Sequence, residues 1–328
     1  MSLTGSPQLS QIPVTVLTGY LGAGKTTLLN RILSENHGKK YAVIINEFGE
    51  LGVDNDLVVG ADEEVFEMNN GCICCTVRGD LIRIIEGLMK RKGKLDGIIV
   101  ETTGLADPAP VAQTFFVDDD VKSNSRLDAI VTVVDAKHLL QRLADSHEAE
   151  EQVAFADVIV LNKTDLVPAE ELGRVEERIR TINKTARILR AEKADVPIAQ
   201  LMDRGAFDLD RILELEPHFL SGEDDHQHDD AVASVSLTAD RPLDRERFNR
   251  WIGAVLMEKG QDLLRTKGIL HLRGNDQRFA FQAVHMLADG EFIGPWKEGA
   301  PRQSRIVFIG RNVNRLELQR GFEACVAA

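Results

Sequence analysis

The feature that most restricts the fold of this 328-residue chain is a glycine-rich turn near its N-terminus. Residues 19–26 have the sequence GYLGAGKT, which fits the phosphate-binding Walker A pattern. That pattern is informative only between a strand and a helix. Both are predicted here, because residues 14–17 are a β-branched apolar run and residues 25–33 carry apolar side chains at helical spacing. The turn therefore predicts a P-loop inside an α/β domain.

Further apolar runs occur at residues 41–45, 98–100, 130–134 and 158–161. Each run is apolar on consecutive residues, which is typical of parallel strands covered on both faces. Segments with helical spacing lie between them, at residues 80–89 and 169–182 for example. Alternating strands and helices predict an α/β fold of the P-loop NTPase class, with a mostly parallel sheet and right-handed crossovers.

The strand and helix alternation fades after about residue 213. Residues 214–230 contain seven acidic residues and three histidines but no Lys or Arg, which is typical of a flexible linker. A second region follows, with strands predicted at 232–237, 269–272, 279–286 and 305–309 and helices at 245–257 and 314–324. We expect a P-loop domain over residues 1–213, a linker over 214–230 and a smaller α+β domain over 231–328.

The overall composition is that of a soluble globular protein, with 43% apolar and 28% charged residues. A net charge of −13 argues against a basic nucleic-acid-binding face. Residues 1–11 lack Lys, Arg and a long apolar core, so they do not resemble a secretory leader. The apolar runs are far shorter than the roughly 20 residues that cross a bilayer. We expect a cytoplasmic protein that binds neither nucleic acid nor membrane.

Phosphate binding is assigned to the glycine-rich turn. Its glycines let backbone N–H groups point inward at the positive end of the following helix. In that arrangement Lys25 spans the β- and γ-phosphates of a nucleotide, and the hydroxyl of Thr26 ligates Mg²⁺.

The base is predicted to be guanine. Asn162, Lys163, Thr164 and Asp165 follow a predicted strand, at the sheet edge where α/β proteins bind ligands. The carboxylate of Asp165 can accept two hydrogen bonds from guanine, whereas adenine offers no such pair of donors. Asn162 is expected to support the loop, and the stem of Lys163 to cover the face of the ring.

Glu101 ends another predicted strand, in the Walker B position, with Gly104 three residues later. Most P-loop GTPases have Asp at this position. The longer side chain of Glu101 could hold a Mg²⁺-bound water or orient the attacking one. A structural alternative is that Glu101 caps the segment that follows it.

Three of the four cysteines cluster between the Walker A and Walker B segments, as Cys72, Cys74 and Cys75. Thiolates select soft or borderline metals such as Zn²⁺ and Cu(I), and three of them leave one tetrahedral position open. The alternatives are a redox switch or buried thiols without a role. Cys325 has no partner nearby in the sequence and is given no function.

Taken together, these motifs resemble the CobW family of metal-handling GTPases in order and spacing. The matching segments are PVTVLTGYLGAGKTT at 13–27, NEFGE at 46–50, GCICC at 71–75, ETTGLADP at 101–108, NKTD at 162–165 and, in the C-terminal region, residues 248–281 with LLRTKGIL at 263–270. The resemblance covers both predicted domains.

The resemblance implies a slow GTPase that binds zinc, or in some branches cobalt, and delivers it to client apo-metalloproteins or to a cofactor pathway. The metal ligands of the family correspond to the three clustered cysteines. The nucleotide-binding residues of the family correspond to Gly22, Ala23, Gly24, Lys25, Thr26, Thr27, Asn162, Lys163 and Asp165. The acidic residues of its first switch correspond to Glu47, Glu50 and Asp54. The implied cofactors are GTP, Mg²⁺ and Zn²⁺, with Co²⁺ as an alternative. The protein is expected to be a monomer or a nucleotide-dependent homodimer.

Three other interpretations stay open. The chain could be a zinc buffer or sensor that binds nucleotide without enzymatic purpose, a cobalt insertion factor of the cobalamin pathway, or a small-molecule kinase built on the P-loop. Many family members also carry a long His-rich tract between the domains, whereas this chain has only His218, His226 and His228 there.

Overall fold

The computed structural model describes residues 11–35, 37–45, 65–67, 76–89, 95–203, 205, 232–299 and 301–327. The predicted linker and both of its boundaries lie outside these ranges. So do the clustered cysteines, the first-switch acids Glu47, Glu50 and Asp54, and the three linker histidines.

The N-terminal region forms a sheet of seven strands, all paired in parallel in the order β3-β2-β4-β1-β5-β6-β7. The strands are β1 Ile12–Thr18, β2 Tyr41–Ile45, β3 Val65–Glu67, β4 Gly97–Glu101, β5 Ser125–Asp135, β6 Val158–Asn162 and β7 Arg187–Arg190. The central strands are buried on both faces, as their uninterrupted apolar sequences require.

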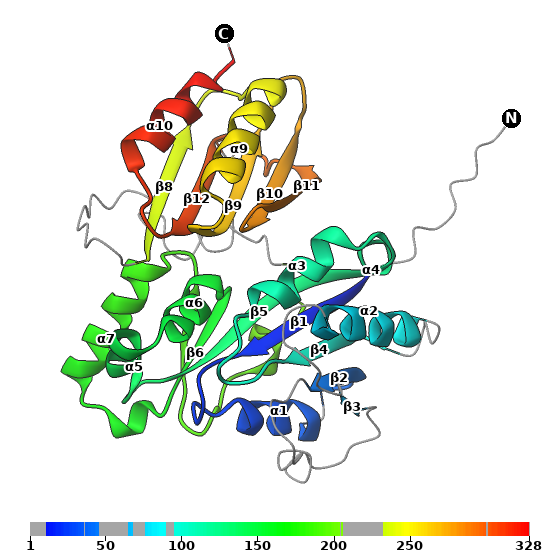
Figure 1. The fold of residues 1–328 in the computed structure, drawn as a ribbon, viewed down its shortest axis with the longest axis vertical. Helices are drawn as coiled ribbons and strands as arrows, with labels where there is room; N and C mark the ends of the chain where they lie inside the picture. The colour runs from blue at the N-terminus through cyan, green and yellow to red at the C-terminus, as the bar shows by residue number, and fades with distance from the viewer. Residues whose placement is uncertain are drawn as a thin grey trace, which may run out of the picture.

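Helices cover both faces of this sheet (Figure 1). Helix α1, Lys25–Ser34, packs on one face, where its leucines join a core with the residues around Ala191–Met202. The other face carries α2 Thr76–Met89, α3 Ala109–Val117, α4 Asp119–Asn124, α5 Leu139–Asp145, α6 His147–Phe155 and α7 Ala169–Ile182. This arrangement is the P-loop NTPase fold, as the sequence predicts.

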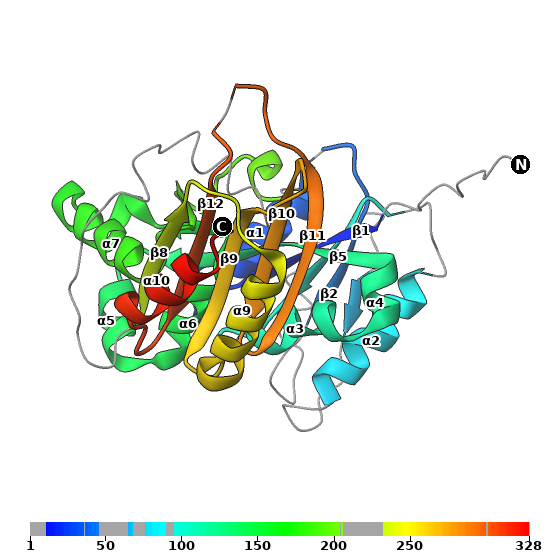
Figure 2. The same cartoon turned by 90° about the horizontal axis from the view of Figure 1, so that it is seen from above.

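The C-terminal region is an antiparallel sheet in the order β11-β10-β9-β12-β8, with two helices on one face (Figure 2). Its elements are β8 Ala233–Ala239, α9 Arg245–Lys259, β9 Leu263–His271, β10 Gln277–Val284, β11 Leu287–Pro295, β12 Ser304–Gly310 and α10 Arg315–Ala324. Phe248, Trp251 and Phe322 of the helices form an aromatic cluster with Phe281 and Phe308 of the sheet. The predicted α+β character is confirmed.

The opposite face of the C-terminal sheet packs on the P-loop domain. Strands β10 and β11 contact α3, β9 contacts α6, and β8 contacts α7. Val232, Leu264 and Val307 join the same core as Val153 of α6. The second sheet is therefore covered by helices on both faces, two of its own and three from the first domain.

Charged side chains are buried in this interface. Arg265, only 1% exposed, donates from Nη2 to both carboxylate oxygens of Asp157, at 3.0 and 3.1 Å, and Lys267 pairs with the same carboxylate. Asp157 also accepts a hydrogen bond from the backbone N–H of Ile130 at 2.7 Å. Burial lowers the pKa of Arg265 to about 9 and that of Lys267 to about 7. Asp157 is the ion-pair partner that both cations share.

The boundaries differ from the sequence expectations where polar residues are buried or an edge is exposed. Strand β9 begins at Leu263, whereas the sequence predicted a start at residue 269. The prediction began too late because Arg265 and Lys267 interrupt the apolar pattern, although both are buried. Strand β11 was not expected, because it lies at the sheet edge, is largely exposed and contains Asp289 and Gly290. Short β3 and half-polar β7 were missed for similar reasons.

No helix in the described ranges combines the length and the apolar character that spanning a membrane requires.

We predict that Asp157→Ala destabilises the protein by about 3 kcal/mol, because it leaves two buried cations without their shared carboxylate. The measurement is urea unfolding followed by the fluorescence of Trp251 and Trp296, which both lie in the C-terminal domain. The control is Asp276→Ala, which removes the 88% exposed partner of Arg302 and should cost less than about 1 kcal/mol. Equal small losses in the two variants would contradict the interpretation.

Candidate nucleotide-binding site

The glycine-rich turn joins β1 to α1 and depends on glycine at two crowded positions. Gly19 has a φ of 140°, and a Cβ there would lie 2.2 Å from the carbonyl oxygen of Val133. Gly24 has a φ of 111°, and a Cβ there would lie 2.5 Å from Nδ2 of Asn162. Any other residue would be strained by both its backbone conformation and its neighbour.

Lys25 begins α1 and its side chain is turned back over the loop. Its Nζ donates to the carbonyl oxygen of Gly19 at 2.8 Å, and the residue is buried. Ala23 is buried, while Thr26 and Thr27 occupy the first turn of α1 with side chains that are half-buried and exposed. The N–H groups of this first turn have no partners within the helix and carry its positive dipole end, so the loop is suited to an anion.

Asn162 ends β6 and ties two loops together. It is 2% exposed, and its Nδ2 donates to the carbonyl oxygen of Ala23 in the P-loop at 2.9 Å. Its Oδ1 accepts from the backbone N–H of Ala194 at 2.8 Å. Ala194 has a φ of 58°, unusual for a residue other than glycine, so this loop after β7 is held in a strained conformation. The predicted support of the loop by Asn162 thus has a structural counterpart.

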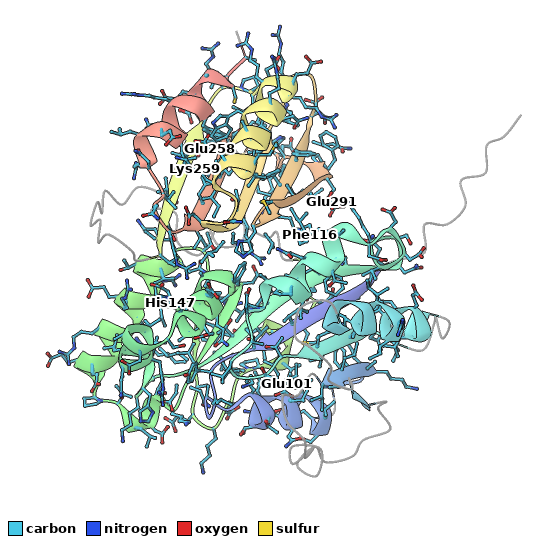
Figure 3. The ribbon with its side chains drawn as sticks, viewed as in Figure 1. Glu101, Phe116, His147, Glu258, Lys259 and Glu291 are labelled. Carbon is cyan, nitrogen blue, oxygen red and sulfur yellow. The ribbon has the colours of Figure 1, made fainter. Side chains whose placement is uncertain are left out.

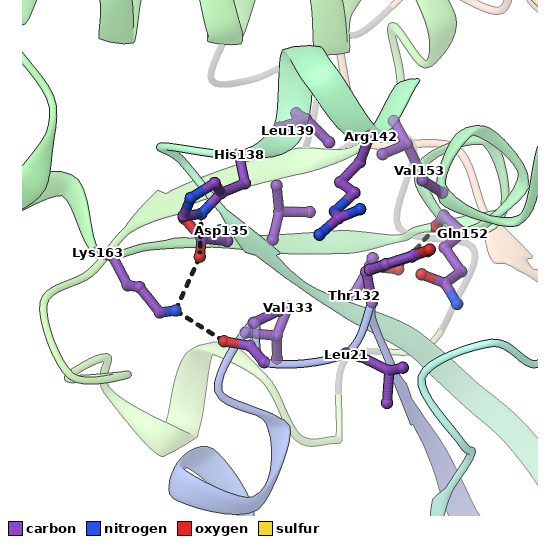
Figure 4. Close-up of a pocket in the computed structure, with 15 residues that line it drawn as sticks. Leu21, Thr132, Val133, Asp135, His138, Leu139, Arg142, Gln152, Val153 and Lys163 are labelled. Atoms are coloured by element: carbon purple, nitrogen blue, oxygen red, sulfur yellow. Dashed lines mark hydrogen bonds and ion pairs between the residues drawn. The ribbon is translucent and has the colours of Figure 1, made fainter. Parts of the chain in front are cut away.

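Lys163 also reaches the P-loop. Its Nζ donates to the carbonyl oxygen of Gly22 at 2.7 Å and to Oδ2 of Asp135 at 2.8 Å (Figure 4). Asp165 lies two residues further, exposed in the 3-10 helix Thr164–Leu166. Residues predicted from two distant motifs therefore gather at one edge of the sheet.

Glu101 lies at the same edge. It ends β4 next to β1, in register with Leu17, and is 8% exposed (Figure 3). The hydroxyl of the next residue, Thr102, donates to the hydroxyl oxygen of Thr18 at 2.8 Å. Gly104 lies against Leu21 of the P-loop. The Walker B strand is thus fixed beside the phosphate loop.

The start of the helix that follows Glu101 has a carboxylate of its own. Helix α3 begins at Ala109, eight residues later, and the side chain that accepts its first backbone hydrogen bond is Asp107, at 2.8 Å from the Ala109 nitrogen. Asp107, one residue before the N-cap Pro108, therefore accepts the backbone N–H of the first helical residue.

Comparisons with known proteins identify the family. Residues 13–190 match the family described as "CobW/HypB/UreG, nucleotide-binding domain", and residues 232–326 match "Cobalamin synthesis protein cobW C-terminal domain". The chain belongs to the CobW family.

Relatives of this CobW-family chain match it over nearly their whole length. "Zinc chaperone YjiA" of Escherichia coli is 36% identical over 96% of this chain and 98% of that protein. "Zinc-regulated GTPase metalloprotein activator 1" of Schizosaccharomyces pombe is 35% identical over 94% of this chain and 84% of its own. The crystal structure described as Zn(II)-bound YjiA GTPase from E. coli superposes with a TM-score of 0.73 over 97% of this chain and 100% of that one, at 30% identity.

The metal ligands of the CobW-family resemblance cannot be placed, because Cys72, Cys74 and Cys75 lie outside the described residues. Within the described ranges, no group of three His, Cys, Asp or Glu side chains gathers as a metal site. Cys325 is buried, its pKa is raised to about 11 by burial, and its thiol donates to the carbonyl oxygen of Gly321. It therefore behaves as a packed side chain of the C-terminal domain.

Sequence reasoning missed two parts of this edge. The loop after β7, with Ala194, was missed because β7 itself was not recognised. Asp135 was missed although it follows the apolar run 130–134 directly, in the same way that Glu101 follows its own strand. An acidic residue immediately after a buried parallel strand was the available signal.

A cavity of about 250 Å³ opens beside the P-loop, between the end of β5 and helices α5 and α6 (Figure 4). Tyr20 and Leu21 form one side, and the guanidinium of Arg142 lies 5.1 Å from the centre of the Tyr20 ring. At its floor, Gln152 donates to the carbonyl oxygens of Gly104 and Ala106, both at 3.2 Å. Helix α6 therefore holds the loop that follows the Walker B strand.

We predict that Gly24→Ala abolishes tight GDP binding, because the added Cβ displaces Asn162 from its bonds to both loops. Gly38→Ala is the matched control: Gly38 also has a positive φ, of 71°, but a Cβ there would contact nothing within 4 Å. Both variants should lose about 1 kcal/mol of stability from backbone strain. Only Gly24→Ala should lose GDP affinity, by about 100-fold or more in calorimetric titration. Equal GDP affinities in the two variants would refute the assignment.

Proposed function

We propose that this protein is a GTP-driven zinc metallochaperone, which binds zinc through Cys72, Cys74 and Cys75 and passes it to client apo-metalloproteins. The observation that carries the proposal is that one chain has both a P-loop site and near full-length similarity to proteins named zinc chaperones. The names of these relatives also favour zinc over cobalt as the cargo.

The enzymatic part is GTP hydrolysis, an activity shared with the relatives named GTPases. In our proposal Lys25 binds the β- and γ-phosphates, releasing its bond to Gly19 as it does so. The hydroxyl of Thr26 and the carboxylate of Glu101 are the hard oxygen donors that Mg²⁺ prefers, and bound Mg²⁺ neutralises developing phosphate charge. Glu101 either holds a Mg²⁺-bound water or orients the attacking one.

Guanine recognition is assigned to the edge formed by β6 and β7. The exposed carboxylate of Asp165 is free to accept the paired donors of guanine, and the stem of Lys163 forms one wall beside it. Asn162 holds the two loops that border the base. Because the side chains of Asn162 and Lys163 are held before the nucleotide arrives, ordering them adds little cost to binding.

The proposed zinc site is supported by chain topology. Strand β3 runs parallel to β2 and ends at Glu67, which is in register with Ile45, and Ile45 is in register with Glu101. Two strand spacings put the backbone of Glu67 about 10 Å from that of Glu101. The cysteines follow Glu67 in the sequence and precede α2, which begins at Thr76. Nucleotide-dependent changes at the Walker B edge are thus close to where the chain enters the cysteine segment.

We predict that Glu101→Gln slows GTP hydrolysis at saturating substrate by about 100-fold, because a neutral amide can neither act as a base nor hold a metal-bound water strongly. The affinity for GDP should change less than about threefold, since GDP has no γ-phosphate for Glu101 to serve. Phosphate release and fluorescent-GDP binding measure the two quantities. Glu170→Gln, on the exposed start of α7, is the control and should leave both unchanged.

The same Glu101→Gln variant separates a chaperone from a zinc buffer. A wild-type chaperone that depends on hydrolysis activates an apo-metalloenzyme faster with GTP than with GDP. The Glu101→Gln variant loses that difference. A buffer delivers zinc at the same rate with either nucleotide already in the wild type, and Glu101→Gln changes neither that rate nor the zinc affinity; that result would overturn the proposal.

We predict that Cys74→Ala weakens zinc affinity by at least about 100-fold, because loss of one thiolate removes a principal ligand from the site. Cys325→Ala serves as the control, since Cys325 is buried in the C-terminal domain and should not affect zinc. A chelator competition titration gives both affinities. Zinc affinity that survived Cys74→Ala unchanged would place the metal elsewhere.

A further inference from the structure

Strand β5 ends at Asp135, which lies beside Asn162 at the end of β6 in the parallel register. The residue after Asn162 is Lys163, and its Nζ lies 2.8 Å from Oδ2 of Asp135 and 2.7 Å from the carbonyl oxygen of Gly22. Three segments therefore meet at one ammonium group: the P-loop, the end of β5 and the proposed base-binding loop.

The carboxylate of Asp135 is itself held in place. The backbone N–H of Lys137 donates to Oδ1 at 2.9 Å, Nδ1 of His138 lies 3.0 Å from Oδ2, and the side chain is 14% exposed. Burial alone would raise the pKa of Asp135, but the hydrogen bonds from Lys163 and His138 lower it below its usual value. The group is therefore a fixed anion at neutral pH.

Lys163 needs such a partner. A lysine side chain has many rotamers, and ordering it on binding would weaken the complex. Lys163 also has a left-handed backbone, with a φ of 61°, which directs the residue back toward the P-loop. The bond to Gly22 uses one of the three ammonium protons of Lys163. Among the described residues, Asp135 is the only charged acceptor for this ammonium group.

We propose that Asp135 is a positioning residue for guanine nucleotides, which acts by holding the stem of Lys163 in its base-covering conformation before the nucleotide binds. This inference rests on the proposed nucleotide site, in which the Lys163 stem covers the ring. Asp135 touches neither base nor phosphate in this account, and its whole effect passes through Lys163.

A positioning role and a merely structural role differ in what they change. If Asp135 acts through Lys163, removing it raises the dissociation constant for GDP by about tenfold, mainly through faster dissociation. In GTP hydrolysis the loss appears in KM more than in kcat. Once Lys163 has been shortened to alanine, removing Asp135 as well has no further effect on GDP affinity.

The experiment is a double-mutant cycle on the full chain, with fluorescent GDP as the probe. The variants are Asp135→Ala, Lys163→Ala and the double variant, and Asp135→Asn replaces Asp135→Ala if the latter does not fold. Asp145→Ala is the control, because Asp145 lies exposed at the end of the neighbouring helix α5 and its side chain makes no ion pair within the described part of the chain. The melting temperature of each nucleotide-free variant is measured alongside.

The expected result is a tenfold rise in Kd for each single variant, no further rise in the double variant, and no change in Asp145→Ala. Rises that multiply in the double variant, or a GDP affinity unchanged by loss of Asp135, would overturn the positioning role. If Lys163→Ala itself left GDP affinity unchanged, the proposed base site would be wrong. The failure of the site and the failure of the inference are thus distinguishable.

Discussion

Two hydrogen bonds from the end of β6 to the P-loop are the constraint on which the rest of the nucleotide edge depends. Asn162 and Lys163 donate to the carbonyl oxygens of Ala23 and Gly22, respectively. These bonds to two of its carbonyl oxygens hold the loop in the conformation that presents the N-terminal end of α1 to an anion. The parallel register of β1, β5 and β6 brings these residues within reach of one another although about 140 positions separate them in the sequence.

The same edge is connected to the C-terminal domain through α6. On one side, Gln152 of α6 holds the carbonyl oxygens of Gly104 and Ala106, in the loop after the Walker B strand. On the other side, Glu151 accepts a hydrogen bond from Arg311 at 3.0 Å, and the ring centroid of Phe155 lies 5.7 Å from that of His285, in the turn between β10 and β11. One short helix therefore contacts both the loop after the Walker B strand and the second domain. The buried Asp157 cluster beside it makes the two domains one packed structure.

Sequence alone was sufficient where function demands a fixed spacing of residue types. The P-loop, Glu101 and the segment from Asn162 to Asp165 could be placed on a common sheet edge, because each follows a strand that is apolar on consecutive residues. Sequence alone was insufficient where the role of a residue depends on a partner that is distant in the sequence. From the sequence, Arg265 and Lys267 are expected to be exposed to solvent, and only the structure shows that they are buried beside Asp157. For this reason the first half of β9 was not predicted. Asp135 likewise has no visible role until β5 and β6 align it with Lys163.

A GTP-driven zinc chaperone, as proposed above, requires that nucleotide and zinc binding be coupled, and coupling between two sites must be reciprocal. The most direct test is the affinity of the protein for a non-hydrolysable GTP analogue, titrated in the presence and absence of saturating zinc. The account predicts that zinc tightens binding of the analogue by about tenfold while leaving GDP affinity nearly unchanged. An affinity for the analogue that is the same with and without zinc would contradict it.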